Sequence, residues 1–188
     1  DKAAIGRMSF NPAIGGLAKG QIVREIDMLG GAMARSSDLC ALQIKTLNKK
    51  KGRAVWSPRA QVDKRKYEEQ IKKTLAKSTV KVIIGEAVSV IIKKNTFQGF
   101  TLRDGTSIYS RSGIITAGTF LSGTVHIGER KILAGRMGEE RAEGLTESLT
   151  SFGFKSARLK TGTPPRLIRE TINWKQAKPS WGDKNPTP

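Results

Sequence analysis

The chain has 188 residues, of which 34 are Lys or Arg and 16 are Asp or Glu, so its formal net charge at pH 7 is +18. Hydrophobic residues make up 37%, which is enough for one modest core and excludes a wholly disordered polyelectrolyte. A single cysteine and a single histidine exclude an internal disulfide and a classical zinc site, and no apolar run approaches the ~20 residues needed to span a bilayer.

The first pattern along the chain is a loop of small residues, 9–20, that leads into a helix. Ile22, Ile26 and Leu29 recur at helical spacing on one face, and Gly30-Gly31 is a typical helix stop. Amide groups at a helix N-terminus attract anions, and a lysine just before this helix adds positive charge. The loop matches neither the dinucleotide nor the P-loop glycine pattern, so a tight turn that lets helix and strand pack closely is the alternative.

A basic stretch and a second helix follow. Residues 45–53 carry few apolar side chains, and we expect them to be exposed. Ser57-Pro58 is a typical N-cap and first-turn pair, and Val62, Tyr67 and Ile71 then recur at spacings of four or five residues. This pattern predicts a helix of about five turns that starts at the Ser-Pro pair.

The middle of the chain has a β-like pattern. Segments 80–84 and 87–93 are dense in β-branched residues and predict two strands. Asp104-Gly105 separates 97–102 from 106–110, which predicts a hairpin closed by a type I′ turn. A short buried strand is predicted over 113–120.

Two later segments have ambiguous chemistry. Residues 116–120 are small enough for a backbone to approach a cofactor, although the segment reads equally well as a strand that ends. Lys160 to Arg166 combines two cations, two hydroxyls and a Pro-Pro corner, which suits a phosphate or an ordinary charged loop. Between them, a helix is predicted over about 143–152 with a stop at Gly153, and the chain after Lys160 is expected to be loop-like.

The charge points to a polyanionic partner. Basic residues concentrate at 45–77 and again at 155–178. Runs of charged residues usually form solvent-exposed faces, but that explanation does not account for the excess of positive over negative charge. We therefore expect RNA as a partner. Cys40 is expected to be buried and inert and His126 to be a packed or hydrogen-bonded residue, and no catalytic set or metal cluster can be assembled from the sequence.

Five motifs, in order along the chain, resemble the GidA (MnmG) family of flavoproteins that modify the wobble uridine of certain tRNAs. They are MSFNPAIGGLAKGQIVREID (8–27), LNKKKGRAVWSPRAQ (47–61), GTFLSGTVHIG (118–128), GRMGE (135–139) and RLKTGTPPR (158–166).

The resemblance implies an α/β fold. Residues 1–127 would form part of an FAD-binding, Rossmann-like domain of the two-dinucleotide-binding type. Residues 128–188 would open an inserted dinucleotide-binding domain and end in a Pro- and Trp-rich tail. We expect the chain to be a fragment, similar to the first third of the family without its opening strand and G-x-G-x-x-G turn.

The resemblance also implies cofactors and contact residues. The family uses FAD, and it uses NADH through segments that this chain does not contain. The implied cofactor-binding residues are Asn11, Pro12, Ala13, Gly15, Gly16, Lys19, Val88, Ala117, Gly118 and Thr119. The basic residues expected to bind RNA are Lys49, Lys50, Lys51, Arg53, Arg59, Lys160 and Arg166.

The resemblance places Phe10 at the position of one family cysteine and the second cysteine in a segment that this chain does not contain, so we do not expect this chain to catalyse the family reaction by itself. Two hypotheses follow. The chain is part of a tRNA-modifying flavoprotein that works with the remaining MnmG segments or an MnmE-like GTPase, or it is a catalytically inactive RNA-binding component of a ribonucleoprotein such as an organellar ribosome. We expect the chain to bind tRNA or rRNA and not to associate with a membrane. We expect it in the bacterial cytoplasm or in a mitochondrion.

Overall fold

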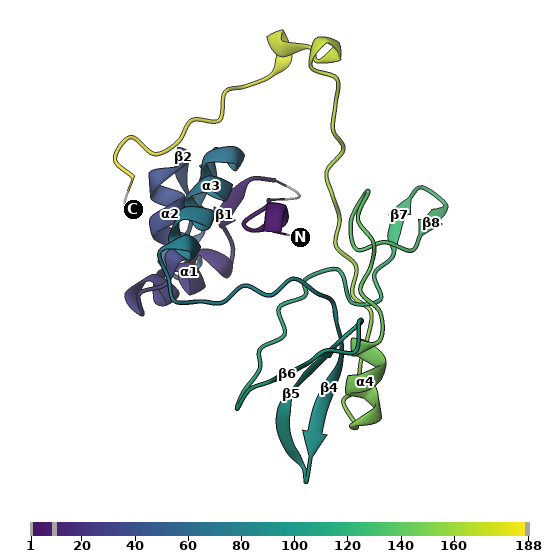
Figure 1. Cartoon of the computed structure of the whole chain (residues 1–188). Helices are drawn as coiled ribbons and strands as arrows, with labels where there is room; N and C mark the ends of the chain where they lie inside the picture. Colours follow the sequence, from purple (N-terminus) through teal and green to yellow (C-terminus); the bar gives the residue numbers. More distant parts are fainter. Residues whose placement is uncertain (1, 9–10, 187–188) are drawn as a thin grey trace. The chain divides into compact units, whose positions relative to one another are not determined.

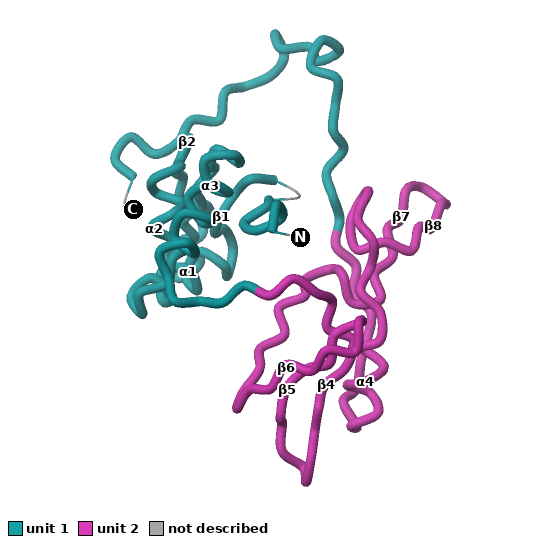
Figure 2. Tube along the Cα trace, viewed as in Figure 1, with its two compact units in different colours: residues 1–82, 162–188 teal, residues 83–161 magenta. Residues whose placement is uncertain are grey.

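The computed structural model describes residues 2–8 and 11–186, so Phe10 lies outside the described residues. The chain divides into two compact units, unit 1 formed by residues 1–82 and 162–188 and unit 2 by residues 83–161 (Figure 2). Each unit combines helices with strands, and the predicted α/β class is confirmed (Figure 1). The predicted division between residues 127 and 128 follows the family fold rather than chain contacts, and it stays a prediction.

The elements have the following bounds. The α-helices are α1 (Lys19–Met28), α2 (Ala32–Leu39), α3 (Lys64–Ala76) and α4 (Leu145–Ser151). The strands are β1 (Ala13–Gly15), β2 (Ala41–Leu47), β3 (Ser57–Val62), β4 (Ala87–Lys93), β5 (Thr96–Leu102), β6 (Ser107–Tyr109), β7 (Val125–Ile127) and β8 (Arg130–Ile132). Short 3-10 helices are η1 (Lys2–Ala4), η2 (Lys49–Lys51), η3 (Arg53–Val55), η4 (Arg169–Thr171) and η5 (Trp174–Gln176).

Unit 1 is built on a three-stranded antiparallel sheet of order β1-β3-β2. Helix α1 contacts β1 and β3, and α2 contacts α1 and α3. Cys40, Val62 and Tyr67 form the buried core between these elements. Burial raises the pKa of the Cys40 thiol, which keeps it protonated and unreactive, as expected from the sequence.

Helix α1 confirms the predicted passage from loop to helix. It ends at Met28, and Gly30 follows with a positive φ of 85°. The apolar face predicted from helical spacing is not covered, however: Ile22 is 53% exposed and Leu29 is 89% exposed. Within the described part of unit 1, α1 therefore uses other residues, Gly20 above all, for its contact with the sheet.

The second helix starts later than predicted. Residues 57–62 form strand β3, and α3 begins at Lys64. The cap is Asp63, whose carboxylate accepts the backbone N–H groups of Arg65 and Lys66 at 3.0 and 3.1 Å. The Ser57-Pro58 interpretation was wrong because pairing with two neighbouring strands prevailed over the local capping signal.

Strand β2 was missed within the basic stretch. Residues 45–47 belong to β2, where Lys45 pairs with Arg59 and Leu47 pairs with Ser57. The expectation of exposure is confirmed for residues 49–53, which form η2 and η3 and are exposed throughout.

Unit 2 contains the predicted hairpin, with a different turn. β5 pairs with β6, but Asp104 has no positive φ and only Gly105 does, at 85°. The loop 103–105 is thus a three-residue connection with glycine in the left-handed position. The two-residue turn with positive φ at both positions joins β4 to β5 instead, at Lys94 (48°) and Asn95 (57°).

Two predicted strands do not form. Residues 80–84 have no regular structure and are exposed, and so are residues 113–116. Val80 is 61% exposed and Ile114 is 87% exposed. A β-branched composition favours a strand only where a neighbouring strand offers hydrogen bonds, and neither segment pairs with a strand in the part of the chain that the structure describes.

The helices are short. α4 confirms the helix predicted near 143–152, with Gly153 at a φ of 88° after its end, and α3 has 13 residues. Among the described residues, none of the helices combines the length and apolar character needed to cross a membrane. The chain after Lys160 is loop-like apart from η4 and η5, as predicted.

We predict that Gly20→Ala destabilises unit 1 by about 1–3 kcal/mol, because an added Cβ would lie 2.5 Å from the backbone oxygen of Pro58. In an ordinary helix the same change is stabilising by up to ~1 kcal/mol, so the sign is diagnostic. Urea unfolding followed by tryptophan fluorescence measures the effect, since all three tryptophans lie in unit 1. Gly162→Ala, where an added Cβ meets open space, is the control. A stabilising Gly20→Ala would contradict the packing described.

Candidate cofactor segments and basic surface

The candidate cofactor residues of unit 1 follow β1 into the start of α1. The Gly16 N–H donates to the Pro58 carbonyl at 2.8 Å, which anchors the turn on β3. The Lys19 and Gly20 N–H groups both donate to the Gly16 carbonyl, at 3.1 and 2.8 Å. The first amides of α1 are therefore engaged within the turn, and what they leave for an anion is the helix dipole and the exposed Lys19 ammonium.

The glycines of this turn have different roles. A Cβ on Gly15 would lie 2.3 Å from the Pro58 oxygen, so this glycine allows the close approach of β1 to β3. The close packing of helix and strand at the same oxygen involves Gly20 of α1, where an added Cβ would lie 2.5 Å away. At Gly16, the nearest atom to an added Cβ is the Arg59 Cδ at 3.9 Å, an ordinary contact. Its φ of 93° still requires glycine, but Gly16 is buried and its own N–H and carbonyl are both hydrogen-bonded within the turn.

The residues just before this turn lie on the edge of the sheet. Asn11 accepts the Gln61 side-chain amide at 3.0 Å, and Pro12 accepts the Val62 N–H at 2.9 Å. Ala13 pairs with Gln61 in β1. A small apolar crevice of about 50 Å³ lies behind β1, lined by Val23, Ala34 and Ile44 among others. Ligand pockets are typically ~300 Å³ or larger, so this crevice is a packing defect and not a cofactor pocket.

The candidate residues of unit 2 lie in β4 and in the turn 117–120. Val88 is half-buried, and Gly144 approaches it so closely that an added Cβ would lie 2.9 Å from the Val88 carbonyl. Gly118 has a φ of 57°, and no atom lies within 4 Å of the position a Cβ would take. The Thr119 hydroxyl donates to the Gly135 carbonyl at 2.9 Å. The backbone of Gly118 is thus open, while the next residue of the turn, Thr119, is held in place by its hydrogen bond to Gly135.

Arg136 adds a donor that the sequence reasoning did not assign. Its guanidinium lies 4.9 Å from the centroid of the Phe120 ring, and one nitrogen bonds Glu139 at 2.8 Å. Its Nε atom is buried and has no hydrogen-bond partner in the described part of the chain. A buried donor without an acceptor is costly, and it fits a ligand that brings an oxygen to this turn.

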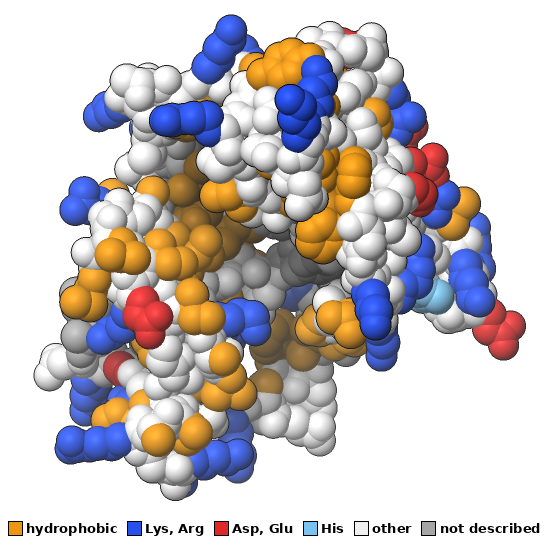
Figure 3. All heavy atoms as spheres, turned by 90° about the horizontal axis from the view of Figure 1, so that it is seen from below, with side chains coloured by type: hydrophobic (Ala, Val, Ile, Leu, Met, Phe, Trp, Pro, Cys, Tyr) orange, Lys and Arg blue, Asp and Glu red, His pale blue; other side chains and the backbone are white. Residues whose placement is uncertain are grey.

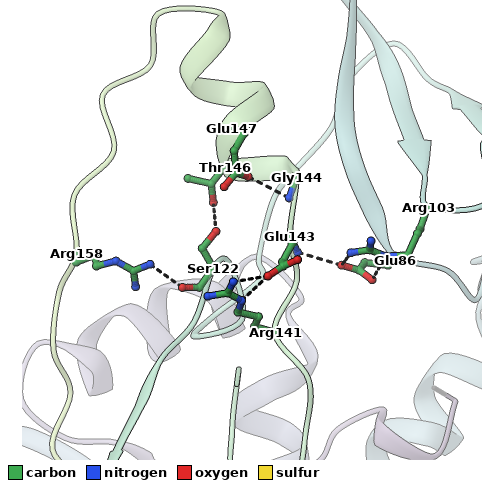
Figure 4. Close-up of polar contacts among 9 residues, drawn as sticks. All are labelled: Glu86, Arg103, Ser122, Arg141, Glu143, Gly144, Thr146, Glu147 and Arg158. Carbon is green, nitrogen blue, oxygen red and sulfur yellow. Dashed lines mark hydrogen bonds and ion pairs between the residues drawn. The ribbon is translucent and has the colours of Figure 1, made fainter. Parts of the chain in front are cut away.

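A polar network in unit 2 links Glu86, just before β4, and Arg103, just after β5, to segment 141–147 at the start of α4 (Figure 4). Glu86 accepts two hydrogen bonds from Arg103, both at 2.7 Å, and a third from the Glu143 N–H at 3.1 Å. Hydrogen bonding from Arg103 is the main cause that lowers the pKa of Glu86. The network positions the segment next to Val88 and requires an ionised Glu86.

The basic loop, which we define as residues 48–56, connects β2 to β3 in unit 1. Lys50 and Lys51 are exposed on η2. The Trp56 indole N–H donates to the Lys49 carbonyl at 3.2 Å, and the Arg53 guanidinium lies 5.7 Å from the Trp56 ring centroid. Figure 3 shows Lys and Arg side chains spread over the face it views, with few Asp or Glu among them.

The other predicted RNA-binding residues are dispersed. Arg59 is half-buried in β3, directly opposite Lys45 of β2 and Gly15 of β1. Lys160 and Arg166 are exposed, but Lys160 belongs to unit 2 and Arg166 to unit 1. The basic loop and Arg59 are therefore the part of the predicted RNA-binding set that one unit brings together.

Asp183 was missed by the sequence analysis. Its carboxylate accepts the Lys49 ammonium at 2.8 Å and the Thr46 N–H at 2.9 Å, and together these lower the pKa of Asp183 to about 2. The contact joins segments more than 130 residues apart in the chain. The only local signal is Gly182, where an added Cβ would lie 2.9 Å from the Ile44 carbonyl.

Comparison with known proteins gives one consistent result. The model of a family described as glucose inhibited division protein A matches residues 1–188. A protein of Bdellovibrio bacteriovorus named tRNA uridine 5-carboxymethylaminomethyl modification enzyme MnmG is 45% identical over 185 residues, covering 98% of this chain and 29% of that protein. The protein of the same name from Aquifex aeolicus is 44% identical over 183 residues, covering 97% and 30%.

Solved structures agree. Two crystal forms of Aquifex aeolicus GidA superpose with TM-scores of 0.89 and 0.90 at 43% identity, and they cover 99% of this chain and 31% of the GidA chain. The mixed α/β arrangement predicted from the sequence is thus that of the matching part of GidA. This chain spans less than a third of the length of the relatives it matches.

We predict that Glu86→Gln destabilises unit 2 by about 1 kcal/mol at pH 7, because it removes the charge from the hydrogen bonds with Arg103. Partial exposure of the pair to solvent keeps the effect small. Because the pKa of Glu86 is lowered from 4.5 by folding, its stabilising effect is complete above that value and is lost as the pH falls through the lower folded pKa. The difference between wild type and variant should therefore shrink in acid.

Amide-exchange protection of β4 and β5, compared at pH 7 and below pH 4.5, measures this difference. Glu129→Gln, in the exposed turn between β7 and β8, is the matched control and should leave protection unchanged. A destabilisation of equal size at all pH values would contradict the role given to the ionised carboxylate.

Proposed function

The chain belongs to the GidA family, and on that premise we propose that it forms part of an enzyme that installs a 5-carboxymethylaminomethyl-type group on the wobble uridine of tRNA. The observation that carries the proposal is the family match over residues 1–188, together with a relative named for this modification that covers 98% of the chain. The relatives are about three times longer, so the activity is proposed for the assembled protein and not for this segment acting alone.

We propose that FAD is the cofactor. The residues that the family resemblance implies for it are Asn11, Pro12, Ala13, Gly15, Gly16 and Lys19 within unit 1, and Val88, Ala117, Gly118 and Thr119 within unit 2. Support comes from the open, exposed backbone at Gly118 and from the unpartnered Arg136 Nε. When bound, FAD would supply redox chemistry that amino-acid side chains lack. The chain's own contribution would be to orient the cofactor through backbone and Arg136, since no catalytic residue is assigned.

We propose that the basic loop and Arg59 bind the phosphate backbone of RNA. The net charge of +18 favours polyanions generally, and phosphate contacts position RNA without reading its sequence. NADH, an MnmE-like GTPase and the remaining MnmG segments are partners proposed for the assembled protein, located in a bacterial cytoplasm or a mitochondrion.

A second candidate function is a catalytically inactive, RNA-binding component of a ribonucleoprotein. Two sequence features favour it: Phe10 stands where the resemblance places a family cysteine, and the charge is strongly positive. A phenyl ring supplies neither a nucleophile nor a proton donor.

Disrupting the coding sequence in its natural host separates the two candidates. Nucleosides from total tRNA are then quantified by liquid chromatography and mass spectrometry. The first proposal predicts loss of the 5-carboxymethylaminomethyl-type uridines, and restoration by a plasmid copy is the control. Unchanged modification, with the protein sedimenting in a ribonucleoprotein particle, would contradict the first proposal and support the second.

We predict that the double variant Lys50→Ala/Lys51→Ala weakens tRNA binding and lowers the slope of log affinity against log salt by about 0.7–0.9 for each phosphate that the variant no longer neutralises. Filter binding at several salt concentrations measures both. The matched control is Arg130→Ala/Lys131→Ala, which removes the same charge from β8 of unit 2. Equal effects of the two double variants would mean that binding is diffuse and does not centre on the basic loop.

A further inference from the structure

The segment 180–183 lies along the outer edge of β2, the edge strand of the unit 1 sheet (Figure 1). The Asp183 N–H donates to the Ile44 carbonyl at 2.9 Å, as a neighbouring strand would. The Gln43 side-chain amide donates to the Ser180 carbonyl at 2.7 Å. The contact is therefore specific, and it ties the end of the described chain to β2.

Asp183 occupies an anion site on this edge. Its two carboxylate oxygens accept one backbone N–H, from Thr46, and one ammonium, from Lys49. A second ammonium, from Lys45, donates to the neighbouring Ser180 hydroxyl at 2.8 Å. The Asp183 side chain is only 18% exposed, whereas that of Lys49 is 51% exposed, so solvent and ligands reach the site from the lysine side.

The site holds more positive charge than Asp183 neutralises. Lys45 and Arg59 face each other directly across β2 and β3, and like charges in that relation are destabilising. At the edge itself, Lys45 and Lys49 place two ammonium groups against the single carboxylate of Asp183. A backbone N–H beside two ammonium groups is also the donor set that binds a phosphate oxygen.

We propose that this edge of β2 is a phosphate-binding site for the RNA backbone, and that Asp183 fills it in the free protein as an internal competitor. The inference rests on the proposed RNA-binding function. An RNA phosphate would accept the Thr46 N–H and the Lys49 ammonium in place of the carboxylate. Segment 180–183 would then leave the edge of β2, so RNA binding and release of this segment are coupled.

Acid alone does not open the site under physiological conditions. With a pKa of about 2, Asp183 stays ionised throughout the neutral range, and the site is occupied until another anion competes for it. A mere structural cap, which protects the sheet edge from pairing with other chains, is the opposing explanation. In that case removing the Asp183 charge should not improve RNA binding.

The test is Asp183→Asn. Asparagine keeps an oxygen that can accept the Thr46 N–H, so the segment can stay docked, but it no longer competes electrostatically for Lys49. We expect the variant to bind single-stranded RNA about five-fold more tightly at low salt, with a salt slope steeper by about 0.7 for one additional phosphate bound. Glu129→Gln, the same charge change on unit 2, controls for net charge and should produce a smaller gain.

Lys49 supplies the second control. In a Lys49→Ala background, Asp183→Asn should give no gain beyond that of Glu129→Gln. A gain that persists there, a gain equal to that of Glu129→Gln in the parent protein, or weaker binding would each overturn the proposal. Circular dichroism of every variant verifies folding, and Ser180→Ala, which removes the Lys45 contact without a charge change, tests whether loosening the segment suffices.

A readout that does not need RNA separates this inference from the proposed function. Inorganic phosphate is titrated into Asp183→Asn while the Thr46 amide resonance is followed by NMR. A saturable shift of the Thr46 resonance that is absent in the double variant Asp183→Asn/Lys49→Ala supports the site. If the wild-type protein then shows no RNA affinity, only the proposed RNA-binding function is refuted. No shift at Thr46 would overturn the site, whether or not RNA binds elsewhere.

Discussion

The carbonyl oxygen of Pro58 is the contact on which unit 1 depends. It accepts the Gly16 N–H at 2.8 Å, and it excludes a Cβ at both Gly15 and Gly20. Pro58 belongs to β3, the central strand, which also pairs with β2. Strand β3 therefore holds both neighbours of the sheet. On one side it fixes the β1–α1 turn with the candidate cofactor residues, and on the other it pairs with β2, which leads into the basic loop.

This arrangement explains how close-packed glycines and clustered cations occupy different parts of one small sheet. Glycines are concentrated where β3 meets the β1–α1 turn, because close backbone approach leaves no room for side chains. Cations are concentrated on β2, on the connecting loop and on Arg59, where they face outward or lie opposite one another. The charge of the chain thus has a structural location, and Asp183 offsets part of it within the unit.

The sequence predicted those elements that short-range features, such as residue spacing and turn residues, are sufficient to specify. Helices α1 and α4 and the β5–β6 hairpin follow from apolar spacing, glycine stops and the Asp104-Gly105 pair. The predictions failed where pairing with distant strands determines the secondary structure. Ser57-Pro58 resembles a helix start but lies in the central strand. The β-branched segment 80–84 has no strand beside it and remains irregular. The type I′ turn at Lys94-Asn95 lacks the glycine that usually identifies such turns.

The candidate sites were predictable to a similar extent. Exposure of Lys50 and Lys51 follows from the lack of apolar neighbours, and the motif positions of the cofactor segments follow from the family resemblance. The sequence does not indicate that Lys49 is paired with Asp183, because the contact bridges more than 130 residues. Nor does it distinguish Gly15, which serves packing, from Gly118, which leaves its backbone open.

The central claim is that this chain retains the cofactor-binding scaffold of the GidA family. Hydrogen–deuterium exchange of the protein purified from its natural host, with and without added FAD, tests it most directly. We expect FAD to increase protection at residues 11–20 and 117–119 and to leave α3 and the basic loop unchanged. Exchange that is identical with and without FAD in both segments would contradict the claim.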